Sequence, residues 1–138
     1  GHSCVWASVA TLVVPSTANF VDFSAIALRN LDDGTGDYGV AIASQESAAV
    51  WLGRLRLGAD SLPTSFSLST GKVYDFPRDG ECRIVYCNIE GLAWQGVDKL
   101  VAASDQMKSK GRQDYRCWDK DQSVHTFLIP TKADEMFG

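Results

Sequence analysis

Two similar strand sequences, each opening the same succession of apolar runs, most constrain the fold of this chain. Val21–Leu28 reads Val-Asp-Phe-Ser-Ala-Ile-Ala-Leu, and Cys87–Trp94 reads Cys-Asn-Ile-Glu-Gly-Leu-Ala-Trp. A turn and a second apolar run follow each of them, at Val40–Gln45 and Leu100–Gln106. Both second runs end in Ser and a polar residue, which is typical of a strand bounded by a turn. The sequence therefore predicts an internal repeat.

The repeat extends to a third strand. Apolar runs introduced by small polar residues follow at Ser47–Leu55 and Gln122–Ile129. Three strands thus occur twice in the same order, over about residues 20–57 and 86–130. Antiparallel strand units repeated at this length are typical of the blades of a β-propeller, each of which is a four-stranded sheet.

Strand patterns also dominate the rest of the chain, as short apolar runs separated by clusters of Gly, Asp, Ser and Pro. We expect strands near Val5–Val14, Phe23–Asn30, Tyr38–Ser44, Ala49–Leu57, Ser65–Leu68, Lys72–Phe76, Arg83–Tyr86, Gly91–Trp94, Lys99–Ser104 and Ser123–Ile129. Ser65–Phe76 would supply the outer strand between the two repeats, and Val5–Val14 the outer strand of a preceding blade. The predicted fold class is therefore all-β, with propeller-like four-stranded antiparallel blades in a single β domain over residues 1–138. A two-layer β-sandwich is the alternative.

Composition and charge exclude several classes of protein. With 45% hydrophobic and 22% charged residues, the 138-residue chain has the make-up of one globular domain, not of a disordered segment. A net charge of −4 and an isoelectric point near 5.0 argue against nucleic-acid binding. The longest apolar stretch, Cys4–Pro15, is too short for a membrane-spanning helix. Because two blades are too few to close a ring, we expect self-association or association with another protein subunit.

Four cysteines, at positions 4, 82, 87 and 117, predict disulfides and an oxidising compartment. They lack the C-x-x-C spacing of a metal site, and only two histidines are present, so zinc is not expected. Four cysteines allow three pairings. We favour Cys87–Cys117, which would close the polar loop between these residues, with Cys4–Cys82 following by elimination. The predicted location is extracytoplasmic: secreted, periplasmic or in an organelle lumen.

Acidic residues beside the predicted strands are the candidate ligand-binding or metal-binding residues. Asp22 and Glu90 are assigned equivalent positions in the two repeats, and Gly91 beside Glu90 permits a ligand to approach closely. Such carboxylates can hold a metal ion or act as a general base. Glu46 and Asp105 follow the two second strands at matching steps, where hydrogen bonds within a turn also explain acidic residues.

The segment Asp32–Asp37 is a candidate calcium loop. It holds three carboxylates, on Asp32, Asp33 and Asp37, together with two glycines, and hard cations bind several oxygen ligands in flexible loops. The segment lacks the terminal Glu of the D-x-[DN]-x-[DN]-G loop, and a plain hairpin turn explains the same residues. Calcium is thus the one candidate cofactor, and the sequence requires none.

The second repeat resembles a known family. Tyr86–Trp94, Leu100–Asp105 and Asp119–His125 are similar to bacterial β-propeller proteins of the esterase-like, phytase-like group. In that group an N-x-E-G-hydrophobic step opens a blade, and an S-D step ends its second strand. Such propellers usually have about five to seven blades, whereas this chain has about two. The resemblance implies a calcium-dependent phosphoester or ester hydrolase.

Two functions are consistent with the sequence. The first is a non-enzymatic binding or assembly module that presents loops and a β surface to a partner. The second is the calcium-dependent hydrolase, in which Glu90, Asp22 and Asp105 would serve as metal ligands or base. A cleft in which Glu90 meets another carboxylate would favour the hydrolase, whereas carboxylates locked in backbone hydrogen bonds would favour the module.

A complete catalytic set cannot be assembled from the sequence. Ser44 and Ser104 lack the G-x-S-x-G elbow of a nucleophilic serine. The one internal histidine, His125, lies within a predicted strand, where histidines usually have a structural role. The binding or assembly module is therefore the preferred hypothesis.

Overall fold

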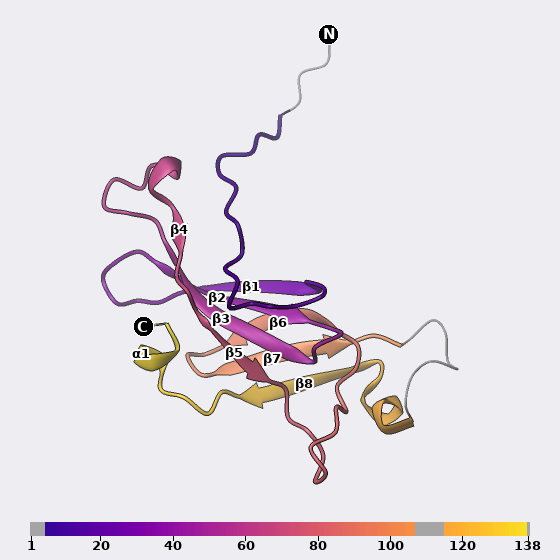
Figure 1. Cartoon of the computed structure of the whole chain (residues 1–138). Helices are drawn as coiled ribbons and strands as arrows, with labels where there is room; N and C mark the ends of the chain where they lie inside the picture. The colour runs from indigo at the N-terminus through magenta and orange to yellow at the C-terminus, as the bar shows by residue number, and fades with distance from the viewer. Residues whose placement is uncertain (1–4, 107–114, 138) are drawn as a thin grey trace.

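Two antiparallel β-sheets make up the fold of this chain. A computed structural model describes residues 5–106 and 115–137 and is shown in Figure 1. Its strands confirm the all-β fold class predicted from the sequence. Within the described ranges the strands form two open sheets, and they close neither a barrel nor a propeller ring.

The first sheet begins as a meander of three strands, β1 (Ala25–Asn30), β2 (Tyr38–Ser44) and β3 (Ala49–Arg56). A 3-10 helix at Pro63–Ser65 follows. Two short strands, β4 (Ser67–Leu68) and β5 (Lys72–Asp75), then pair with the two ends of β3. Together they occupy the place of a single outer strand, which the sequence predicts at Ser65–Phe76.

The second sheet has the same meander, formed by β6 (Ile89–Gln95), β7 (Lys99–Ser104) and β8 (Ser123–Leu128). A 3-10 helix, Tyr115–Lys120, precedes β8, and the short helix α1 (Ala133–Met136) follows it. None of the strands in the described ranges pairs with the outer edge of β8. The second sheet therefore has three strands where four were predicted.

Two segments predicted as strands do not form them. Val5–Val14 has no regular structure, and Figure 1 shows this segment leading away from the sheets. Arg83–Tyr86 contributes a single isolated bridge, between Arg78 and Ile84. Both segments are rich in residues that favour an extended backbone, but a strand forms only where a neighbouring edge accepts its hydrogen bonds.

The two sheets stack face to face around a shared apolar core (Figure 1). β1 lies beside β6, and the indole N–H of Trp94 donates to the Ala27 carbonyl at 3.4 Å across the interface. Alternate residues enter the core because successive side chains of a strand point to opposite faces. The first sheet contributes Ala27, Ala41, Ala43, Val50 and Leu52, and the second contributes Ile89, Leu100, Ala102 and Phe127.

The other face of the first sheet is covered by residues 14–20. Trp51 is fully buried there, in a cluster with Val40 and Ile42. Its indole N–H donates to the Thr17 hydroxyl at 3.0 Å and to the Thr70 carbonyl at 3.2 Å. Trp51 therefore holds the segment that precedes β1 against the sheet, and β2 and most of β3 are buried on both faces, whereas the outward side chains of β1 stay exposed.

Candidate functional site

Polar side chains gather at one end of the stacked sheets, where β2 and β7 end. Ser44 and Ser104 are the last residues of these strands, and both are buried. The side-chain amide of Gln45 donates to Asn88 Oδ1 at 3.2 Å, which links the end of β2 to the start of the second sheet. This polar end is where the sequence predicts ligand-binding carboxylates.

Asp22 is bonded to the turn that follows β2. Its Oδ1 accepts hydrogen bonds from the Ser44 hydroxyl at 2.6 Å and from the Glu46 N–H at 3.1 Å, and its Oδ2 accepts one from the Gln45 N–H at 3.1 Å. Glu46 takes part through its backbone, while its side chain is exposed. A carboxylate that accepts several hydrogen bonds from its own chain stabilises the turn. Asp22 therefore has a structural role that accounts for its place.

Asn88 lies just before β6, at the start of the second sheet. The side-chain N–H of Asn88 donates to Asp121 Oδ1 at 2.9 Å. The backbone carbonyl of Asn88 accepts a hydrogen bond from the Asp105 N–H at 2.9 Å. The carboxylate of Asp105 accepts the N–H of the next residue, Gln106, at 2.7 Å. Asp105 is thus a local turn residue, in line with the hydrogen-bonding explanation of its position.

Glu90 lies on a β-bulge and is exposed. β6 pairs with β7 on either side of it, at Ile89 and Gly91, so Glu90 is one extra residue without a counterpart in β1. With that extra residue left out, the register sets Cys87 against Asp22, so the predicted equivalence of Asp22 and Glu90 is wrong. Among residues 5–106 and 115–137, no three His, Cys, Asp or Glu side chains are placed so that they could hold a metal ion.

Ser104 and His125 form a pair that sequence reasoning missed. Ser104 Oγ lies 3.0 Å from His125 Nε2, a separation that also joins a nucleophile to its base. The Ser104 hydroxyl donates to the Lys120 carbonyl, however, and His125 Nε2 lies 3.2 Å from the same oxygen. A carbonyl oxygen only accepts, so one carbonyl of the 3-10 helix is the shared acceptor for both side chains. The pair fastens the end of β7 to the 3-10 helix that precedes β8.

The predicted calcium loop is bound by an arginine. Arg54 on β3 forms ion pairs with Asp33 at 2.9 Å and with Asp37 at 3.0 Å. Hydrogen bonds from the Thr35 hydroxyl and N–H, followed by those from Arg54, lower the pKa of Asp33 to about 2. Asp32, the third carboxylate of the loop, is exposed. Two of the three predicted calcium ligands therefore already face a cation supplied by the chain itself.

The predicted Cys87–Cys117 disulfide is present. Its Cα atoms are 5.7 Å apart, and it joins residues separated by 30 positions. Cys117 is buried in the 3-10 helix, so the bond holds this helix beside the polar end. Cys82 is exposed and free. Its predicted partner, Cys4, lies outside the described residues.

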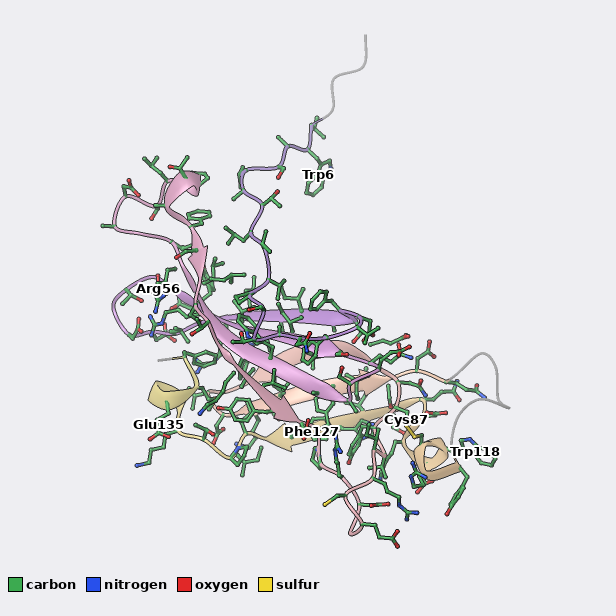
Figure 2. The ribbon with its side chains drawn as sticks, in the orientation of Figure 1. Trp6, Arg56, Cys87, Trp118, Phe127 and Glu135 are labelled. Atoms are coloured by element: carbon green, nitrogen blue, oxygen red, sulfur yellow. A yellow bond between two sulfur atoms is a disulfide. The ribbon has the colours of Figure 1, made fainter. Side chains whose placement is uncertain are left out.

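Apolar side chains are exposed on the outer face of β1, at Ile26 and Leu28, and on two further surfaces. The first is the outer face of the second sheet, which points away from the core. The second is the N-terminal arm, defined as residues 5–13, in which Trp6 is 91% exposed and lies far from the sheets in Figure 2. Exposed apolar patches mark surfaces that bind proteins, membranes or ligands. The outer face of the second sheet is formed by Ala93, Val101, Ala103, Val124, Thr126 and Leu128.

Comparisons with known proteins add no relative to this description. No family model matches the chain, and no curated protein or solved structure matches it either. The resemblance to phytase-like propellers therefore stays a prediction from the sequence. The described part of the chain contains no helix that is long and apolar enough to cross a membrane.

Proposed function

We propose that this chain is a non-enzymatic binding or assembly module whose partner is a protein, either another copy of the chain or a different subunit. The observation that carries the proposal is the outer face of the second sheet. Val124 and Leu128 on β8 are 73% and 66% exposed there, and β8 is an edge strand without a partner in the described ranges. Edge strands of this kind pair readily with another chain.

Three of the acidic candidates support the same proposal because they stabilise the fold. Asp22 accepts three hydrogen bonds from the turn after β2, and Asp33 and Asp37 share Arg54. Glu90 stands apart from these groups on its bulge. Roles in a turn and in ion pairs explain Asp22, Asp33 and Asp37 without a substrate.

An extracytoplasmic location is part of the proposal. The Cys87–Cys117 disulfide supports it, because disulfides form and persist in oxidising compartments. The propeller-like arrangement is likewise proposed: the first sheet has the strand order of a four-stranded blade, and the second sheet repeats three of those strands.

Hydrolysis assays test the proposal against the calcium-dependent enzyme. The purified chain is incubated with p-nitrophenyl phosphate and p-nitrophenyl acetate, with calcium or with a chelator. We expect no calcium-dependent turnover, and the same result for Glu90→Gln and for the matched surface variant Glu81→Gln. Saturable calcium-dependent hydrolysis that Glu90→Gln abolishes and Glu81→Gln retains would overturn the module and establish the enzyme.

A further inference from the structure

We infer that the protein partner is a second copy of this chain, which adds its N-terminal arm to the edge of β8 and packs its first sheet on the outer face of the second sheet. The inference rests on the proposed function and names the partner of that module. It follows from comparing matching positions of the two sheets.

Val50 and Val124 occupy matching positions. Each is the second residue of the third strand of its meander, β3 or β8. The residue before it pairs with the serine that ends the preceding strand, Ser44 in the first sheet and Ser104 in the second. Val50 is 4% exposed, because its face of the first sheet packs against the second sheet. Val124 is 73% exposed. The face of the first sheet that carries Val50 is buried against the second sheet. The matching face of the second sheet, which carries Val124, is its exposed outer face.

The opposite faces of the two sheets also match. Leu92 and Trp94 of β6 pack into the shared core. The residues in the same register of β1 are Ile26 and Leu28, which are 62% and 52% exposed. Ile26 borders a largely apolar groove of about 410 Å³. The second sheet contacts the first sheet through large apolar residues of β6. The outer face of the first sheet exposes large apolar residues at the matching positions of β1.

The segment that covers the first sheet belongs to this face and does not block it. Phe20 stands five residues before Ala25 and packs on the outer face of the first sheet. Tyr86 stands five residues before Gly91, the residue that matches Ala25, and it packs edge-on against Phe127 within the core. A connecting segment with an aromatic residue is therefore part of the interface inside the molecule as well.

Unlike faces meet inside the molecule, so the same contact can form between copies. The exposed face of the second sheet in one copy is complementary to the exposed face of the first sheet in another. Such a contact joins two different surfaces, head to tail, and it produces a ring or an open chain of copies. The proposed contact between copies repeats the contact between the two sheets of one chain, because both pack the Val50 or Val124 face of one sheet against the β1 or β6 face of the next.

The edge of β8 lacks the partner that β3 has. β5 pairs antiparallel with Ala49–Leu52 at the start of β3. The matching part of β8 is Ser123–Thr126, whose outer edge is unpaired in the described ranges. The backbone N–H and carbonyl groups of that edge are available to a strand from another chain.

The N-terminal arm supplies a strand at the matching distance. Fifteen residues separate the end of β5, Asp75, from Gly91 in β6. Fifteen residues also separate Val9 from Ala25, the residue of β1 that matches Gly91. Trp6–Val9 thus corresponds to β5, and Trp6 and Val9 are of the residue types that favour strands. In the assembled pair Trp6–Val9 of one copy lies antiparallel to Ser123–Thr126 of the other, with Ser8 opposite Val124, as Tyr74 is opposite Val50.

Disulfide trapping tests this register. Two chains are prepared in a background that carries Cys4→Ser and Cys82→Ser: one contains Ser8→Cys and the other Val124→Cys. After mixing and mild oxidation, we expect a linked dimer of about twice 15.0 kDa from the mixture and none from either chain alone, because the contact joins unlike surfaces. Val97→Cys, an exposed valine in the turn before β7, replaces Val124→Cys as the control. Linkage no greater than this control, or equal linkage of each chain with itself, would overturn the inference.

The mass in solution tests the contact without cross-linking. Light scattering should give a mass of at least two copies for the natural chain and for Val97→Asp, and 15.0 kDa for Val124→Asp. A natural chain that stays at the monomer mass up to about 1 mM, where even weak contacts form, would overturn the inference and leave the module with a different protein as its partner. The proposed module function is tested separately, by the assay for calcium-dependent hydrolysis.

Discussion

The replacement of Gly53 by alanine tests how Trp51 is packed on the first sheet. A Cβ atom at Gly53 would lie 2.2 Å from Trp51 Cη2 and 2.5 Å from Cζ2. Carbon atoms pack best at about 3.5–4.0 Å, so the ring or the strand must move by more than about 1 Å. The indole also lies over Gly71, where an added Cβ would be 2.3 Å from Trp51 Cε2, and its N–H is held by Thr17 and Thr70.

The cost of Gly53→Ala follows from these contacts. Overpacking of a core costs about 1–3 kcal/mol, and the loss of one indole hydrogen bond costs about 1 kcal/mol more. We therefore expect the free energy of unfolding to fall by about 2–4 kcal/mol, measured by urea denaturation followed by far-UV circular dichroism. Gly80→Ala is the matched control, because no atom lies within 4 Å of its added Cβ, and its effect should stay within about 0.5 kcal/mol.

A double-mutant cycle identifies the group that the new methyl group meets. Phenylalanine at position 51 lacks the second ring of the indole, so Gly53→Ala should cost less than half as much in a Trp51→Phe background as in the natural chain. An undiminished cost in that background would refute the clash with Trp51. So would a Gly53→Ala variant as stable as Gly80→Ala.

Two further predictions concern the Arg54 loop and the disulfide. The pKa of Asp33 in the fold is about 2, below its ordinary value of 3.8, so its contribution to stability is present above about pH 4 and is lost as the pH falls towards 2. Thr35→Val removes the hydroxyl donor, so NMR titration should show the pKa of Asp33 rising towards its ordinary value and acid unfolding should depend less on pH; an unchanged pKa would contradict this account. Replacement of Cys87 and Cys117 together by serine should lower the free energy of unfolding in urea by about 3–4 kcal/mol, as expected for a loop of this length, and a loss below about 1 kcal/mol would contradict the expectation.

Local pattern was sufficient to predict most strands. β2 and β7 have the predicted bounds, Tyr38–Ser44 and Lys99–Ser104, because each is an apolar run that stops at Ser before a polar residue. The outer strand of the first sheet was also predicted, although it is split between β4 and β5. Strand periodicity and turn residues are local signals, and they remain readable without the fold.

Features that depend on register or on distant partners were not predicted. The bulge at Glu90 adds one residue to β6, and a single extra residue leaves no mark in composition. Arg54 meets Asp33 and Asp37 across the first sheet, and Ser104 meets His125 across the second. These contacts arise from strand pairing, which brings together residues about 20 positions apart.

The N-terminal arm shows the limit of strand propensity. Val5–Val14 has the composition of a strand, and yet it forms none in the described chain. Propensity measures how well a residue fits a pleated and partly buried surface. It does not state whether the chain itself supplies that surface.

The unequal burial of the two sheets has a consequence for the order of folding. The first sheet has an apolar cluster of its own around Trp51, on the face turned away from the core. The buried residues of the second sheet, such as Leu100 and Ala102, lie only on the face towards the first. Hairpins of both meanders can form from local contacts, but the second meander gains its burial only by docking. We therefore expect the N-terminal meander to act as the template on which the C-terminal one is completed, and we expect the C-terminal one to open first under mild destabilisation.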